Sequence, residues 1–132
     1  MFTKEEKDLV FADICARLPY KPRVEIEYVG DVRGTVYTES GILDPSTTYS
    51  DVLRDFLLGK IISMKTYLRK MSSMTAEERK VYNNLRKSAS PWACVDWLNK
   101  NYFDYNSLLC KGLAIELTKN NNPYESLRAI LF

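Results

Sequence analysis

Residues 23–29 read Arg-Val-Glu-Ile-Glu-Tyr-Val, and this alternation decides the expected fold. The apolar residues of the stretch fall on one side of an extended chain and the charged residues fall on the other, which is typical of a half-buried strand. Gly30-Asp31 follows, and residues 32–38 are again rich in β-formers. The sequence therefore predicts an antiparallel hairpin closed by a two-residue turn with glycine first.

Helical patterns surround this hairpin. Thr3 and Thr75 each precede a glutamate by three residues, Glu6 and Glu78, and this spacing predicts a capping box at the start of a helix. A short helix is expected before Gly59, with Ser50 or Asp51 as its N-cap. The remaining expected elements are a strand over residues 60–68, a helix from Pro91 with Trp92, Val95 and Leu98 facing inward, a short helix at residues 104–112 and a last strand over residues 113–117.

The order of these elements predicts an α+β fold. We expect a small antiparallel sheet of three to four strands, with helices packed on one face. The chain of 132 residues is in the usual range for one domain, so residues 1–132 are predicted to form a single domain. Residues 120–132, which begin with Asn120-Asn121-Asn122-Pro123, are expected to form a frayed or partner-bound tail.

Composition excludes several chemistries. The chain has no histidine, so it cannot assemble a Ser-His-Asp or Cys-His mechanism. Its three cysteines, Cys15, Cys94 and Cys110, are widely spaced and match neither a zinc-site nor a disulfide pattern, and they are interpreted as buried apolar residues. We predict no catalytic residues, no metal site and no cofactor, and the non-enzymatic interpretation is favoured.

One segment of the chain is strongly basic. Residues 54–87 hold nine Lys/Arg and three Asp/Glu, whereas the whole chain has a net charge of only +2. A nucleic-acid-binding role for the segment from Lys65 to Lys87 is the alternative function, with Tyr67 or Tyr82 stacking on a base. An ordinary charged helix face remains the simpler interpretation. The candidate binding residues are Lys65, Arg69, Lys70, Arg79, Lys80, Arg86 and Lys87.

Aromatic and apolar residues gather after this segment. Trp92 and Trp97 are five positions apart, about 140° around a helix, so both cannot easily face the same core. Core packing is the leading interpretation, and one tryptophan is expected under a loop or at a contact with another protein. The candidate partner-contact residues are Trp92, Trp97 and Phe132 at the end of the apolar tail.

The best candidates for carboxylate chemistry are Glu25 and Glu27. They lie two positions apart on one face of the expected strand, about 6–7 Å along the chain, and Glu39 or Asp44 could approach from the next strand. Such a cluster could bind Mg²⁺ or Ca²⁺, or form an acid–base pair. An exposed strand face requires the same alternation, so a carboxylate- or metal-dependent hydrolase ranks third among the functions.

Three separated stretches carry a resemblance. They are residues 3–20, with Thr3-Lys4-Glu5-Glu6 and Ala16-Arg17-Leu18-Pro19-Tyr20, residues 67–78, from Tyr67-Leu68-Arg69-Lys70 to Thr75-Ala76-Glu77-Glu78, and residues 97–115, from Trp97-Leu98-Asn99 to Leu113-Ala114-Ile115. As a set they resemble a group of short uncharacterised proteins of gut anaerobic bacteria and their mobile elements. The group has no assigned activity, so it supplies no site residues. Its members often carry proline where Lys70 stands and histidine near Tyr102, and this chain departs at both positions.

The leading functional hypothesis is therefore a non-enzymatic protein-interaction module or an accessory protein of a bacterial mobile element. Its expected partner is a protein, including a second copy of the chain as a homo-oligomer. No apolar run approaches the ~20 residues needed to cross a bilayer, so no membrane partner is expected. A secretory signal needs a basic start followed by an uninterrupted apolar stretch, and the N-terminus has neither. The expected compartment is therefore the cytoplasm.

Overall fold

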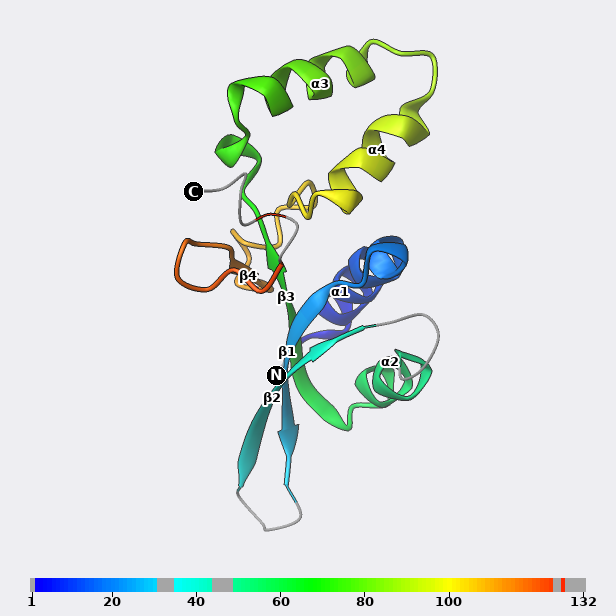
Figure 1. Ribbon diagram of the computed structural model, residues 1–132. Helices are drawn as coiled ribbons and strands as arrows, with labels where there is room; N and C mark the ends of the chain where they lie inside the picture. The colour runs from blue at the N-terminus through cyan, green and yellow to red at the C-terminus, as the bar shows by residue number, and fades with distance from the viewer. Residues whose placement is uncertain (1, 31–34, 44–48, 125–126, 128–132) are drawn as a thin grey trace.

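The computed structural model describes residues 2–30, 35–43, 49–124 and 127, which form an α+β fold (Figure 1). Along the chain the elements are α1 (Lys4–Arg17), η1 (Leu18–Tyr20), β1 (Arg23–Val29), β2 (Val36–Ile42), α2 (Tyr49–Leu57), β3 (Ile61–Leu68), η2 (Met71–Ser73), α3 (Ala76–Arg86), α4 (Pro91–Lys100) and β4 (Ala114–Glu116). Within these residues, none of the helices combines the length and the apolar character needed to span a bilayer.

The described strands form one sheet in the order β2-β1-β3-β4. β1 runs antiparallel to both of its neighbours, as expected, but β4 lies parallel to β3, so the sheet is mixed and not wholly antiparallel. The connection explains the difference. Residues 69–113 pass through α3 and α4, and a crossover of this length lets β4 run in the same direction as β3, beside its last three residues.

The alternation of residues 23–29 is confirmed by the packing of β1. Val24 lies opposite Thr66 of β3 and Ile26 lies opposite Met64, and these residues face the side of the sheet on which α1 and α2 lie (Figure 1). The two helices bury their own apolar stripes there, because each helix has one apolar face to remove from water. The core includes Val10, Ile14, Val24, Leu53, Phe56, Met64, Leu68, Leu108 and Leu113.

The predicted two-residue turn is wrong. β1 ends at Val29, β2 begins at Val36, and the backbone N–H of Gly30 donates to the carbonyl of Thr35 at 2.9 Å. In this register Tyr28 lies opposite Tyr37, and their rings stack with centroids 5.8 Å apart. A turn at residues 30–31 would have paired Tyr28 with Arg33 instead, so the side-chain pairs outweigh the local turn signal. Residues 31–34 lie outside the described part of the chain.

Two expectations about short helices also change. α2 already includes Ser50 and Asp51, so neither is its N-cap, whereas Gly59 does end the helix with φ of +79°. Residues 104–112 form turns and not a helix. Asp104 still satisfies backbone donors there, because its carboxylate accepts from the N–H groups of Leu108 and Leu109, each at 2.9 Å.

The tail packs on the body as far as it is described. The ring of Tyr124 stacks on that of Tyr102 with centroids 3.7 Å apart, and Leu127 is buried. The Tyr124 hydroxyl accepts from the backbone N–H of Arg23 and donates to the carbonyl of Tyr67. Phe132 and the predicted end of the tail lie outside the described residues, as does Asp44.

Both predicted capping boxes are present. The Thr3 and Thr75 hydroxyls accept from the backbone N–H groups of Glu6 and Glu78, and each glutamate side chain accepts from its threonine N–H in return.

Thr75→Ala is expected to lower the free energy of unfolding by about 1 kcal/mol, because the backbone N–H of Glu78 in the first turn of α3 loses its partner. Thr75→Ser keeps the hydroxyl and should lose less than half of that in urea denaturation. Equal losses in the two variants would contradict the cap.

Candidate functional site

Five side chains form a stacked column that joins the α3–α4 hairpin to the body. The guanidinium of Arg86 lies over the ring of Tyr82, Tyr82 stacks on Trp97, Trp97 stacks on Phe103, and the guanidinium of Arg69 lies 4.1 Å from the Phe103 ring centroid. Stacked aromatic pairs and guanidinium groups over aromatic faces are both attractive. The stacked column therefore ties α3 and α4 to each other and to the end of β3.

Arg69 is the base of this column. It is only 1% exposed, and its two terminal nitrogens donate to the two carboxylate oxygens of Glu78 at 2.8 and 2.7 Å. Burial raises the pKa of Glu78, but the hydrogen bonds from Arg69 and Thr75 and the charge of Arg69 lower it by more, so the pKa lies below its ordinary value. The pair therefore stays ionised at neutral pH and holds the first turn of α3 against β3.

The stacked column fixes the rotation of α4 about its axis. Trp97 faces Tyr82 and Phe103, so Trp92, about 140° away around the helix, is turned to solvent and is 80% exposed. The prediction that Trp92 and Val95 face inward with Leu98 is wrong, because only Leu98 of the three is buried. The apolar pattern of α4 has two faces, and the stacked column selects the one that contains Trp97.

Trp92 borders a hollow between α1 and α4. The hollow has a volume of about 610 Å³. We call its lining the α4 surface, which consists of Ala16, Ser90, Trp92, Ala93, Val95, Asp96 and Asn99. Ala16 comes from α1 and was not predicted, because it is far from Trp92 along the chain. The small residues Ser90 and Ala93, close to Trp92 in the sequence, were the only local indication of a hollow there.

The polar groups of the α4 surface are held in place. The Asp96 carboxylate accepts a hydrogen bond from the Tyr20 hydroxyl, and the Asn99 side-chain carbonyl accepts from the Tyr105 hydroxyl at 2.7 Å. The hydrogen bond to Asp96, with burial and the negative charge of Asp96, raises the pKa of Tyr20. Tyr20 therefore remains a donor at neutral pH and keeps the Asp96 carboxylate oriented beside the hollow.

The structure does not bring the seven basic candidates into one patch. Arg69 is buried in its pair with Glu78, Lys70 pairs with Glu116 at 3.2 Å, and Lys65 lies opposite Glu25 in the middle of the sheet. The others lie on α3 or directly after it and are exposed: Arg79, Lys80, Arg86 and Lys87. Arg86 is also engaged over Tyr82, and α3 lies beyond the end of β3 (Figure 1).

The two candidate carboxylates are bound by hydroxyl groups. Glu25 accepts from Ser40 at 2.5 Å and from Tyr67 at 2.6 Å, and Glu27 accepts from Ser63 at 2.6 Å. Burial, followed by the hydrogen bond and charge of Glu25, raises the pKa of Tyr67 to about 12. Of the two candidates for a third carboxylate, Glu39 does not join them, because it lies on the face of Ile26, its partner on β1. Within the described residues no group of three His, Cys, Asp or Glu side chains lies together as a metal site.

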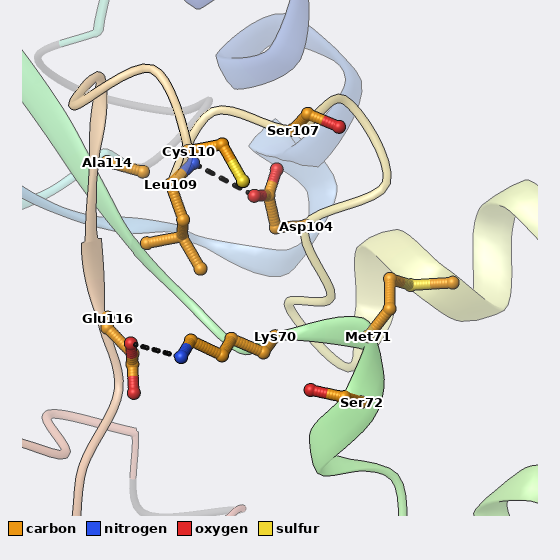
Figure 2. Close-up of a pocket in the computed structure, with 9 residues that line it drawn as sticks. All are labelled: Lys70, Met71, Ser72, Asp104, Ser107, Leu109, Cys110, Ala114 and Glu116. Atoms are coloured by element: carbon orange, nitrogen blue, oxygen red, sulfur yellow. Dashed lines mark hydrogen bonds and ion pairs between the residues drawn. The ribbon is translucent and has the colours of Figure 1, made fainter.

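A second hollow, of about 620 Å³, lies between the end of β3, β4 and the turns at residues 104–110 (Figure 2). Lys70 reaches across to Glu116, and Cys110 points toward Asp104. Both carboxylate oxygens of Asp104 are already used by backbone N–H groups, so this carboxylate has a structural role. The interpretation of the three cysteines as buried apolar residues holds only in part: Cys15 is half-buried and packs against the core, Cys94 is half-buried, and Cys110 is exposed.

Comparisons with protein-family models, with curated proteins and with solved structures give no match to this chain.

Proposed function

We propose that this protein is a non-enzymatic interaction module that binds another protein through the α4 surface. The observation that carries the proposal is Trp92, which is 80% exposed beside a hollow on a helix that the stacked column holds rigidly. Tryptophan is enriched where binding energy concentrates in protein interfaces. Because the backbone of a preorganised helix is already ordered, binding through such a side chain costs only the rotamer freedom of the side chain itself.

The chemistry of the α4 surface indicates the kind of partner. Its lining is mainly apolar, and Asp96 is the one charged residue among the described residues that line it. A complementary segment would place an apolar side chain in the hollow and a lysine or arginine next to Asp96. The nucleic-acid alternative has less support, because Arg69 is buried in its pair with Glu78 and the exposed Lys70 is paired with Glu116. The resemblance to proteins of bacterial mobile elements favours a cytoplasmic bacterial partner.

A displayed library of random peptides, selected on the purified full chain, tests the proposal. We expect selected peptides to contain an apolar residue followed closely by lysine or arginine, and Trp92→Ala to weaken their binding by about thirtyfold, the effect of a typical hot-spot residue. The binding constants would be measured by isothermal titration calorimetry. Trp92 is exposed, so its replacement should change the free energy of unfolding by less than about 0.5 kcal/mol.

Val81→Ala is the matched control, because Val81 is an exposed apolar residue on the neighbouring helix α3 and not in the lining of the hollow. It should leave the binding of the peptides unchanged. Peptides that bind equally well to the Trp92→Ala variant, or a library that gives no peptide dependent on Trp92, would contradict the proposal.

A further inference from the structure

The strand β2 forms an edge of the described sheet, and no other described strand pairs with its outer side. It pairs with β1, whereas α1 and α2 pack against β3 and against each other. All of its residues are exposed except Gly41, which is half-buried. β2 is seven residues long, and the part of it near the β1–β2 connection projects away from the helices (Figure 1). An edge of this length presents unpaired backbone groups that can bind another strand.

Two hydrogen bonds show which backbone groups point outward. Gly30 donates to the carbonyl of Thr35 before β2, and Leu43 donates to the carbonyl of Pro22 after it. In an antiparallel pair, residues that exchange hydrogen bonds alternate with residues that do not. The alternation between these two anchors turns Tyr37, Glu39 and Gly41 toward β1. It leaves the N–H and C=O groups of Val36, Thr38, Ser40 and Ile42 directed outward.

The side chains of β2 do not protect this edge. Soluble proteins commonly guard an exposed edge strand with lysine, proline or a bulge. β2 reads Val-Tyr-Thr-Glu-Ser-Gly-Ile, with neither lysine nor proline, and its pairing with β1 is regular along its whole length. Val36 and Ile42 are 55% and 41% exposed, and Glu39 is the only charged residue of the strand.

We propose that β2 pairs with β2 of a second copy of this chain, antiparallel about a two-fold axis, so that the two sheets become one. A second copy fits because the outward groups recur at every second residue. In an antiparallel pair of two such strands, outward donors of one copy therefore meet outward acceptors of the other. β4, at the other edge, has only three residues, so pairing through β2 closes a dimer and does not continue into a filament.

Charge selects the register of the two strands. A pairing centred on Glu39 would place two carboxylates directly opposite each other, which is unfavourable. A pairing centred on Thr38 places Glu39 opposite Tyr37 of the other copy and brings the two Thr38 side chains together. Cross-strand threonine pairs are favourable. In this register Val36 of each copy exchanges hydrogen bonds with Ser40 of the other.

Amide hydrogen exchange across a range of protein concentrations tests the pairing residue by residue. The amides of Val36, Thr38 and Ser40 should exchange rapidly in dilute protein and become protected as concentration rises. Those of Tyr37, Glu39 and Gly41 should be protected throughout by β1. Sedimentation equilibrium should show the mass of a dimer over the same range of concentrations.

Thr38→Pro removes an outward N–H and leaves the hydrogen bonds to β1, because proline is tolerated on an edge strand where its nitrogen faces solvent. We expect it to weaken dimerisation by at least about tenfold, since each dimer loses two hydrogen bonds. Thr38→Ala is the matched control and should remain dimeric. Trp92→Ala should also remain dimeric, which separates this proposal from the function of the α4 surface.

Three results would overturn the proposal. One is a chain that stays monomeric at the highest concentration with the amides of Val36, Thr38 and Ser40 still exchanging rapidly. Another is a dimer in which those amides stay unprotected, which would place the contact elsewhere. The third is a Thr38→Pro variant that folds, as judged by its circular dichroism, and dimerises as tightly as the unmodified chain.

Discussion

Arg69→Ala is expected to lower the free energy of unfolding by about 3–5 kcal/mol, because it leaves the buried carboxylate of Glu78 without its positively charged partner. The variant also loses the contact between the Arg69 guanidinium, which ends the stacked column, and the ring of Phe103. Since the backbone of Arg69 still binds Tyr102 and Asp104, the path of the chain should survive while its stability falls. Urea denaturation would measure the loss, and the midpoint of thermal unfolding should fall by roughly 10–20 °C.

Two variants control this result. Arg79→Ala removes an exposed arginine of the same hairpin, and it should change the free energy of unfolding by less than about 0.5 kcal/mol. Arg69→Lys keeps the charge but cannot form both hydrogen bonds to Glu78. Its loss in the free energy of unfolding should therefore fall between those of Arg69→Ala and Arg79→Ala. Equal losses in Arg69→Ala and Arg79→Ala would show that the buried pair is not a main support of the hairpin.

The effect of Arg69 should also depend on pH. The pKa of Glu78 is lowered in the folded chain, so its contribution to stability is present above the unfolded carboxyl pKa of about 4.3 and is lost as pH falls through the folded value. The difference in the free energy of unfolding between the unmodified chain and Arg69→Ala should therefore be largest near pH 7 and should become smaller below about pH 4. A difference that stays constant over this range would contradict the ion pair.

Arg17→Met is expected to cost a similar amount, about 3–5 kcal/mol, for a related reason. Arg17 and Asp13 are both almost wholly buried in α1, and the Arg17 Nε donates to Asp13 at 2.9 Å. A terminal nitrogen of Arg17 also donates to the carbonyl of Phe103 at 2.6 Å, so the side chain ties α1 to a member of the stacked column. Methionine fills much of the same space but leaves both acceptors without this donor.

A double variant separates the charge from the packing. Asp13→Leu with Arg17→Met replaces the whole pair by apolar side chains, which is often neutral or stabilising when the volume is kept. It should recover most of the stability lost by Arg17→Met alone, although the carbonyl of Phe103 and the side chain of Asn106, which donates to Asp13, would still lack partners. If Arg17→Met by itself costs less than about 1 kcal/mol, the pair does not stabilise the fold as argued.

The two largest expected effects thus fall on residues that the sequence did not mark as structural. Arg69 was a candidate ligand for phosphate, and Arg17 appeared only as part of a resemblance. A charged residue is normally exposed, and a pattern of charges along a chain does not show which of them will meet a buried partner. Glu78 was predicted to cap α3, and it does so, but its second role as the partner of Arg69 depends on how the chain turns at η2.

The same limit applies to the candidate site. The spacing of Trp92 and Trp97 predicted that they would face different ways, and the structure agrees, but the spacing alone did not show which one would be exposed. The stacked column decided it, because Phe103 and Tyr82 lie where only one face of α4 can pack on them. The hollow beside Trp92 has the same origin, since Ala16 meets α4 only when α1 is in place.

The sequence by itself determined the features that depend on neighbouring residues: the two capping boxes, the helix end at Gly59, the alternation of β1 and the α+β class. These features follow from hydrogen bonds and side-chain directions within a few residues. Only the tertiary structure decided the length of the β1–β2 connection, the parallel β4, the burial of Arg69 and the exposure of Trp92. For each of these features, several arrangements have similar local energies, and contacts between residues far apart in the chain determine which arrangement is the most stable.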